Sequence, residues 1–412
     1  MENMTPLPSQ AEAQAFPFLN GIILELFARA QMPAEHRAQR LGRLLVVECA
    51  TEVNAILDLP EAFVKNFGLV AAFGPSRFNL NGERWMSSRA RTQRHYAQAG
   101  RPHMRPAVGA IYHEEIESLK TPKIADLELA LGRAALRVFF LAFGLRPDVE
   151  PFLQQFARLR SAAAILQFQS WNSVADLQSV ELAPLAQAER LVQDFWSTCD
   201  AQPEVKALIE SLATQSPDIQ RNDMVSDFMT NMFAGIETTT ASLAWMINGL
   251  ARSAEVQARL HASVLAGTPD VAAYRNETMR FFPAIPFVVR EVAEKTAIGN
   301  RVFEVGDMIM ISLIGFHRDD KMWSKPNEFH AARPEFMARS DAANEGFKPF
   351  LSGPRACGGR RIAESEIVEA FDLLVRTFSF ENPERDTPFQ YSLAFRPLLP
   401  ATLSVTRRSS GG

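Results

Sequence analysis

One cysteine in a glycine-rich loop is the residue of this chain best suited to bind a metal ion. Cys357 lies in the segment Phe350-Leu-Ser-Gly-Pro-Arg-Ala-Cys-Gly-Gly359, directly before a helical pattern at 360–376. Glycines let backbone amides approach the sulfur, and a helix N-terminus favours the anionic thiolate. A thiolate on a haem iron promotes cleavage of the O–O bond. The loop therefore predicts a stabilised thiolate, the kind of ligand that oxygen-activating haem enzymes use, and the alternative is a buried, inert thiol.

This loop resembles the signature Phe-x-x-Gly-x-Arg-x-Cys-x-Gly of the cytochrome P450 family. The matching residues are Phe350, Gly353, Arg355, Cys357 and Gly359, followed by Ala363 and Glu366 in the next helix. The resemblance implies that Cys357 is the axial thiolate ligand of haem b, that the loop residues contact the cofactor, and that O2 is a co-substrate. It also implies a mainly helical, triangular single-domain fold with small β-sheets.

The second candidate site interrupts the longest helical pattern, Asp223 to Arg252. Its sequence is Ala234-Gly-Ile-Glu-Thr-Thr-Thr240. Glycine and threonine are poor formers of helix interiors, and threonine hydroxyls can bond back to the preceding turn, so a local distortion is expected. In the resembled family this segment opens a groove beside the iron. The resemblance places Ala234 against the haem and makes Glu237 and Thr238 the pair that delivers protons to dioxygen.

Taken alone, the same threonines would more simply fill a helix interface, with Glu237 facing solvent. The cysteine loop reverses that preference, because heterolytic cleavage of an O–O bond needs protons and an acid with a hydroxyl supplies them.

A third group of residues is charged and is expected to be structural. Glu277 and Arg280 are three positions apart on one helix face, and Phe329-His-Ala-Ala-Arg333 follows about fifty residues later. By resemblance, Glu277, Arg280 and Arg333 form a buried network that supports the segment before the cysteine. The family's usual proline is Ala331 here, so Arg318 is the alternative to Arg333.

The two carboxylates of a haem need cationic partners. Trp85 and Arg89 lie one helical turn apart, and the resemblance places them at the haem edge together with Arg290 and Arg355. A solvated surface position is the alternative for each arginine.

Substrate contacts are also expected from the resemblance alone, and the residues concerned are apolar. Thirty phenylalanines against four tyrosines fit a hydrophobic pocket, although an aromatic core would account for most of them. We expect a small or medium hydrophobic substrate. The pocket residues implied are Phe67, Val70, Phe73, Phe168 within 165–171, Phe233, Ile236, Phe287, Val288 and Phe395.

The remaining sequence predicts one globular domain over residues 1–412, with flexible ends at 1–12 and 407–412. With 47% hydrophobic and 22% charged residues the chain has an ordinary globular composition. Most segments show helical spacing of apolar residues. Alternation typical of strands is confined to Leu44–Cys49, Phe287–Glu291, Arg301–Val305, Met308–Leu313 and Ala401–Val405.

Charge and cysteine content narrow the cellular context. A formal net charge of −4 gives no reason to expect nucleic acid as a partner. Three cysteines far apart in sequence suit a reducing cytoplasm. The apolar stretch at 16–30 is short and contains Glu25 and Arg29, so no membrane anchor is expected. The start of the chain and the short stretch from Leu250 to Glu277 resemble bacterial family members.

A monooxygenase reaction consumes two electrons from outside the haem. We expect separate proteins to supply them, because the sequence contains no dinucleotide-binding or phosphate-loop motif. By resemblance the donor is a ferredoxin or flavodoxin-type protein with its reductase. It would dock on a basic surface made of Arg89, Arg91, Arg94, Arg101, Arg105, Arg360 and Arg361.

The expected function is therefore a monooxygenase that hydroxylates, epoxidises or dealkylates its substrate. The alternatives are an atypical haem-thiolate reaction, such as oxidative coupling, ring formation or peroxide-driven oxidation, and a non-catalytic haem-binding protein. Glu237 and Thr238 argue against peroxide-driven enzymes, which typically carry Arg-Pro there.

Overall fold

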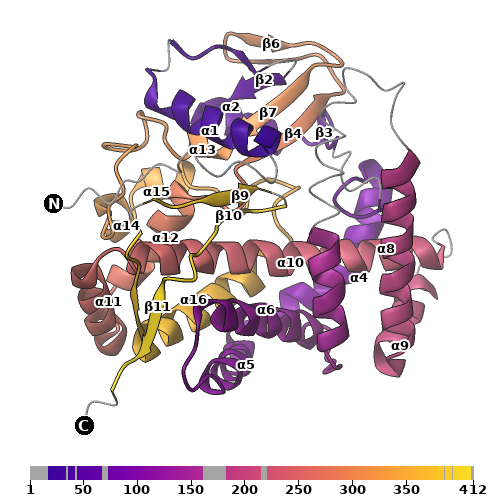
Figure 1. Ribbon diagram of the computed structural model, residues 1–412. Helices are drawn as coiled ribbons and strands as arrows, with labels where there is room; N and C mark the ends of the chain where they lie inside the picture. Colours follow the sequence, from indigo (N-terminus) through magenta and orange to yellow (C-terminus); the bar gives the residue numbers. More distant parts are fainter. Residues whose placement is uncertain are drawn as a thin grey trace.

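The computed structural model describes residues 17–33, 36–41, 44–66, 73–160, 182–214, 220–384, 386–391 and 393–409. The chain is mainly helical, as expected, and has small sheets (Figure 1). The largest sheet lies on one side of the molecule, whereas the strand at 404–407 lies on the other side among the long helices. The longer helices are α1 (Pro17–Gln31), α2 (Ala50–Asp58), α4 (Gly82–Ala99), α5 (Arg105–Glu117), α6 (Ile124–Leu141), α8 (Leu182–Asp200), α9 (Pro203–Thr214), α10 (Arg221–Leu250), α11 (Ala254–Ala266), α12 (Asp270–Phe281) and α16 (Arg360–Thr377).

Helix α10 crosses the whole molecule, and α6, α8, α9, α12 and α16 pack around it (Figure 1). Its 30 residues span about 45 Å at 1.5 Å per residue. Side chains on all sides of it are buried, which is typical of a helix at the centre of a large protein. The helix starts and ends two residues earlier than predicted. It ends at Leu250 because Ser253 caps the next helix by accepting a hydrogen bond from the Val256 amide.

The largest sheet has five strands in the order β1-β2-β7-β4-β3. Strands β2 and β7 are parallel and the other pairs are antiparallel. In the antiparallel pair β4–β7, Arg290 lies opposite Ile309, which fixes the position of the arginine in the sheet. The strands are β1 (Arg40–Leu41), β2 (Leu44–Val47), β3 (Phe63–Val64), β4 (Phe287–Val292) and β7 (Met308–Ser312).

The remaining strands and helices are short. Strand β11 starts later than predicted because the Leu403 amide bonds to the Pro400 carbonyl in a turn. Near the C-terminal end, Arg407 forms an ion pair with Glu117 at 2.8 Å, and the Arg408 amide donates to the Thr377 carbonyl. These elements are β5 (Thr296–Ile298), β6 (Arg301–Phe303), β8 (Phe378–Glu381), β9 (Phe389–Tyr391), β10 (Phe395–Pro397), β11 (Ser404–Arg407), α13 (Leu313–Phe316), α14 (Pro334–Met337) and α15 (Asp341–Glu345).

Aromatic side chains fill the interface between α6 and α10. Phe139 lies 5.2 Å from Phe228, and Phe140 lies 4.9 Å from Phe152, as measured between ring centroids. Such contacts are those of a close-packed core. Many of the phenylalanines are therefore core residues, which was the simpler of the two explanations for their number.

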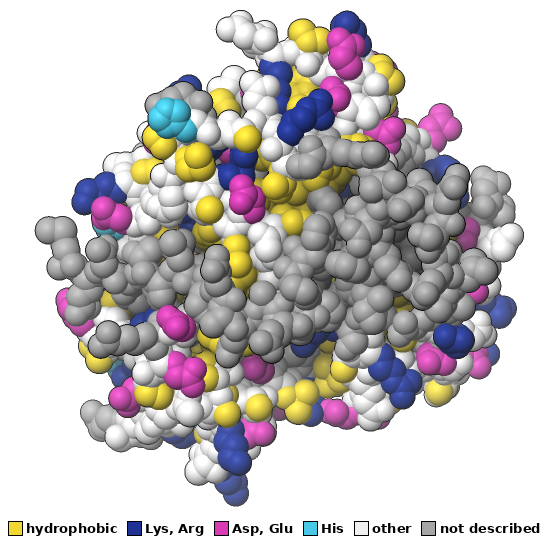
Figure 2. Space-filling model, turned by 45° about the horizontal axis from the view of Figure 1, so that its top comes forward, with side chains coloured by type: hydrophobic (Ala, Val, Ile, Leu, Met, Phe, Trp, Pro, Cys, Tyr) yellow, Lys and Arg dark blue, Asp and Glu magenta, His cyan; other side chains and the backbone are white. Residues whose placement is uncertain are grey.

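The surface shows no block of a single charge on the face drawn in Figure 2, where basic and acidic side chains of the described residues are interspersed. Within the described ranges, no helix combines the length and the apolar character needed to cross a bilayer.

Candidate active site

The cysteine loop is held by backbone hydrogen bonds and feeds directly into α16. The Cys357 amide donates to the Phe350 carbonyl at 2.9 Å, and the Ala356 amide donates to Gly353 at 3.2 Å. Gly353 has a φ of +68°, and a β-carbon there would collide with the carbonyl oxygen of Leu57 in α2. Only glycine tolerates both the positive φ and the close contact. The fold therefore explains why the motif has a glycine at this position.

The sulfur of Cys357 is open to a ligand although protein surrounds the loop. The residue is exposed, yet burial raises the pKa of its thiol. The backbone amides of Gly359 and Arg360 and the cations of Arg77 and Lys65 act in the opposite direction, because they stabilise the thiolate. The loop thus has the donors that a bound thiolate requires.

Helix α10 is partly exposed at the segment 234–240, which the sequence analysis identified as a candidate site. From Met224 to Ile247 every residue is buried except Ala234, Gly235 and Thr238, and Gly235 is exposed. The Thr238 hydroxyl donates to the Ala234 carbonyl at 2.9 Å, the back-bonding expected for threonine within a helix. The three residues form a small, side-chain-poor face on an otherwise buried helix.

Glu237 is 1% exposed and does not face solvent. The Arg160 guanidinium, in a helical stretch at 150–160, donates to its Oε2 at 2.9 and 3.1 Å. Arg396 in β10 lies 3.7 Å from Oε1 and also binds Glu128 at 2.7 Å. The simple alternative of a solvated glutamate is therefore wrong.

Three cations gather near the loop without a carboxylate partner in the described part of the chain. They are Lys65, Arg290 and Arg355. Burial lowers the pKa of Arg290 to about 10, and burial followed by the charge of Arg290 lowers the pKa of Arg355 to about 10. Burial and then Arg290 and Arg355 lower the pKa of Lys65 well below its usual value. The charges of Arg290 and Arg355 destabilise that of Lys65, and Arg290 destabilises the charge of Arg355, which the carboxylate of Glu61 offsets in part. The cluster therefore favours an anion.

Two buried nitrogens of this cluster, Nη2 of Arg290 and Nε of Arg355, have no hydrogen-bond partner among the described residues. Unpaired buried donors are costly. The two propionates of a haem would supply both the charge and the acceptors, so the residues present fit this cofactor. Lys65 was missed by sequence reasoning, because it is a lone lysine outside any motif.

Trp85 and Arg89, the pair predicted to lie at the haem edge, differ in their exposure to solvent. The Arg355 guanidinium stacks on the Trp85 ring at 4.1 Å, which places Trp85 beside the cation cluster. Arg89 is exposed, with its guanidinium 5.4 Å from the same ring and 3.5 Å from the Pro354 carbonyl. Arg89 lies close enough to Arg355 for its charge to act on that guanidinium, but unlike Arg355 it is exposed.

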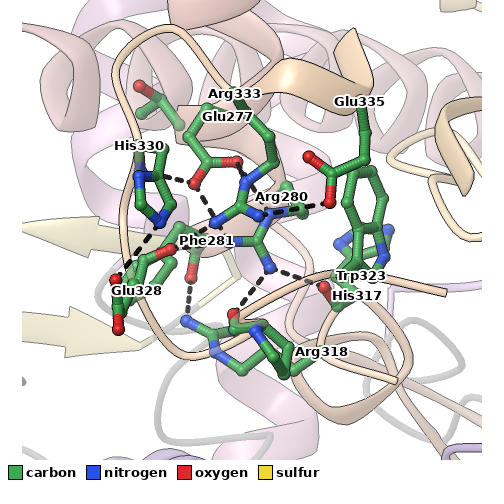
Figure 3. A network of polar contacts seen from close by, with 12 residues as sticks. Glu277, Arg280, Phe281, His317, Arg318, Trp323, Glu328, His330, Arg333 and Glu335 are labelled. Atoms are coloured by element: carbon green, nitrogen blue, oxygen red, sulfur yellow. Dashed lines mark hydrogen bonds and ion pairs between the residues drawn. The ribbon is translucent and has the colours of Figure 1, made fainter. Parts of the chain in front are cut away.

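Glu277 lies between two guanidinium groups in a fully buried network (Figure 3). Its Oε2 accepts from Arg280 and from Arg333, both at 2.7 Å, and its Oε1 accepts from Arg280 at 3.0 Å and from the His330 amide at 2.9 Å. Arg318 instead donates to the Phe281 carbonyl at 2.8 Å. The structure thus brings Arg333, and not the alternative Arg318, to Glu277.

This network reaches the cysteine loop through His317, which sequence reasoning missed. Arg280 donates to the His317 carbonyl at 2.7 Å, and the Lys348 amide donates to the ring Nε2 of His317 at 3.1 Å. Burial, followed by the charge of Arg280, holds the pKa of His317 well below its usual value. The ring stays neutral, as an accepting nitrogen requires.

Most of the predicted pocket residues that the structure describes are buried in the core. Phe395 is fully buried against Trp245, at 4.8 Å between centroids. Phe233 packs on Phe156 at 4.7 Å. Phe73, Ile236 and Phe287 are also buried, and Val288 is half-buried. Phe67, Val70 and Phe168 lie outside the described residues.

Comparison with known proteins identifies relatives over most of the chain. A family model described as cytochrome P450 matches residues 70–403. Cytochrome P450 3A56 of Fundulus heteroclitus is 26% identical over 318 residues, which cover 72% of this chain and 62% of that protein. Cytochrome P450 monooxygenase sphH of Aspergillus fumigatus is 28% identical over 206 residues, covering 44% of this chain and 38% of that protein. The chain thus spans less than two thirds of the length of these relatives.

Comparison with solved structures also identifies proteins of this fold. A zebra fish cytochrome P450 solved with progesterone superposes with a TM-score of 0.73 at 18% identity, covering 93% of this chain and 99% of that one. At this identity the likeness shows the fold. The relatives named above are eukaryotic, so they give no support to the expected kinship with bacterial members.

Proposed function

This chain belongs to the cytochrome P450 family, and from that membership we propose that it is a monooxygenase that inserts one oxygen atom from O2 into a small or medium hydrophobic substrate. Hydroxylation, epoxidation and dealkylation are reactions of this class. The observation that carries the proposal is an accessible cysteine beside two buried arginines and a half-buried lysine that form no ion pair with a carboxylate within the described ranges. The family's cofactor is a haem with a cysteine thiolate ligand.

In this proposal the chain's own residues hold the cofactor and move protons. Cys357 binds the iron, and Lys65, Arg290 and Arg355 bind the propionates through charge-assisted hydrogen bonds. Bound haem supplies the activation of O2, which a thiolate ligand favours. Trp85 keeps the Arg355 guanidinium in place by stacking on it.

Thr238 and Glu237 are proposed to deliver protons. Thr238 lies on the open face of α10, and its hydroxyl could rotate from the Ala234 carbonyl to donate a hydrogen bond into that space. Glu237 is the neighbouring residue, and its partner Arg160 keeps one third of its side chain exposed. Protons can therefore pass from water to Glu237 at the edge occupied by Arg160, and a positioned acid with a hydroxyl relays them.

The proposal is tested by turnover with surrogate electron donors. We expect Thr238→Ala to lower product formation by roughly 100-fold, the lower range for a positioned proton donor, while release of hydrogen peroxide rises. Thr238→Ser should retain most of the product. Both product and peroxide are measured against the electrons consumed.

A matched control is Thr240→Ala, because the Thr240 hydroxyl bonds back to Ile236 in the same way but lies on a buried face. Its coupling of electrons to product should stay at the wild-type level. Equal coupling in Thr238→Ala and wild type removes Thr238 from the mechanism. Haem binding without any product would favour the alternative of a non-catalytic haem-binding protein, and product formed only with peroxide would favour the atypical reactions.

The electron donor is proposed to be a ferredoxin or flavodoxin-type protein with its reductase, acting in the cytoplasm. The basic surface expected for docking is smaller than predicted. Arg91 is buried, 3.9 Å from Asp227, so it is not available for docking. The exposed arginines that remain are Arg89, Arg94, Arg101, Arg105, Arg360 and Arg361, of which Arg105 pairs with Glu369 and Arg360 with Glu364.

We expect reduction of the haem by an acidic ferredoxin to slow markedly with added salt. Exposed charges are screened as the Debye length falls from about 10 Å at 0.1 M to about 3 Å at 1 M, and electrostatic steering weakens accordingly. Stopped-flow reduction over this range measures the effect. A rate that does not depend on salt would contradict docking on these arginines.

A further inference from the structure

Arg77 is a buried cation fixed next to the cysteine loop, and no motif pointed to it. The residue is 7% exposed and precedes α4. Its backbone amide donates to Asp227 of α10 at 2.9 Å. Its guanidinium donates from Nη1 to Thr92 at 3.3 Å and from Nη2 to Gln93 at 3.0 Å. The side chain is thus held by two neutral residues of α4.

Gln93 connects this cation to the residue that follows the cysteine. Its Oε1 accepts from Arg77, and its Nε2 donates to the Gly358 carbonyl at 3.0 Å. A β-carbon at Gly358 would collide with Nη2 of Arg77, so the guanidinium packs directly on the Gly358 backbone. The charge therefore sits against the peptide adjoining the sulfur.

No carboxylate binds the Arg77 guanidinium within the described ranges. The nearby Asp227 accepts from the Arg77 amide and from the Ser88 hydroxyl, and it lies 3.9 Å from Arg91. That carboxylate accepts no hydrogen bond from the guanidinium, although the two charges attract each other. Propionates can neutralise Lys65, Arg290 and Arg355, whereas the hydrogen bonds of Arg77 are all made to protein.

We propose that Arg77, positioned by Gln93, raises the reduction potential of the iron held by Cys357. The inference rests on the proposed function. One electron from an external donor converts ferric to ferrous iron and adds one negative charge to the iron–thiolate unit. A buried, fixed positive charge stabilises the more negative state, because charges interact strongly away from water. Nearby charge and hydrogen bonding around the sulfur are among the means by which proteins set such potentials.

The test is a spectroelectrochemical titration of the haem-loaded protein. In Arg77→Met we expect the ratio of ferrous to ferric protein at a fixed electrode potential to fall at least tenfold, a decrease of 59 mV for a one-electron couple. Arg77→Lys keeps a positive charge and should recover most of that shift. A merely structural role for Arg77 would predict the same loss in both variants.

The control is Arg360→Met, because Arg360 also adjoins the loop but its side chain is exposed and paired with Glu364 at 2.8 Å. Solvent screens that charge, so the ratio should change less than twofold. A second variant, Gln93→Glu, places a carboxylate on Arg77 and should lower the ratio in the same direction. Haem bound with an unchanged potential in Arg77→Met, or in Gln93→Glu where Arg77→Met does not fold, overturns this inference alone. A wild-type protein that binds no haem overturns the proposed function as well.

Discussion

In Cys357→His, we expect the ferrous carbon monoxide complex to lose the red-shifted Soret band that thiolate ligation produces, while the protein still binds haem. Imidazole is a competent ligand for haem iron, so the substitution separates loss of the thiolate from loss of the cofactor. The cation cluster of Lys65, Arg290 and Arg355 is untouched and should keep the haem in place. Monooxygenase turnover should fall below detection, because the electron-donating ligand has been removed.

The control for this experiment is Cys49→Ser. Cys49 is half-buried at the N-terminus of α2, and serine is a good residue for that position. We expect the wild-type spectrum and wild-type turnover. A thiolate spectrum that survives Cys357→His, or that is lost in Cys49→Ser, would contradict the assignment of the iron ligand.

Glu277→Ala should lower the free energy of unfolding by roughly 3 to 5 kcal/mol, because it leaves two guanidinium groups buried without their anion. Arg280 and Arg333 are both completely buried, and each donates to the same carboxylate. A loss of this size is a large part of the stability of an ordinary protein, so little folded haem protein should be recovered. Chemical denaturation, with haem content per chain as a second measurement, tests the expectation.

Two further variants make the Glu277 result specific. Glu277→Gln keeps the shape but removes the charge, and we expect it to fall between wild type and Glu277→Ala. Glu364→Ala breaks an exposed pair with Arg360, and such pairs contribute about 0.5 kcal/mol or less. Equal stability of Glu277→Ala and Glu364→Ala would show that the buried network does not support the fold.

The parts of the site that could be predicted from the sequence are those encoded within a few residues. Gly353 and Cys357 belong to one loop, and Glu277 and Arg280 share one helical turn. The back-bonding of Thr238 follows from its own side chain. In each case the residue spacing itself dictates the geometry.

The residues that were missed depend on contacts between distant parts of the chain. Lys65 joins Arg290 and Arg355 only when the segment after β3 lies beside β4 and the cysteine loop. Arg77 reaches Gly358 only through α4. The pocket assignment of Phe395 stays a prediction, because an apolar side chain looks the same in a core and in a binding site. Pairing across such distances has no signal in one sequence.

The close contact between Gly353 and the Leu57 carbonyl has a consequence for biosynthesis. The cysteine is made late, yet its loop takes its final shape only against α2, which leaves the ribosome early. Contacts between residues so far apart in sequence form slowly. A nascent chain released before Gly353 can dock on Leu57 therefore carries every residue of the early segments but no finished cofactor site. Assembly of the cysteine loop therefore depends on a contact between two segments that are synthesised far apart in time.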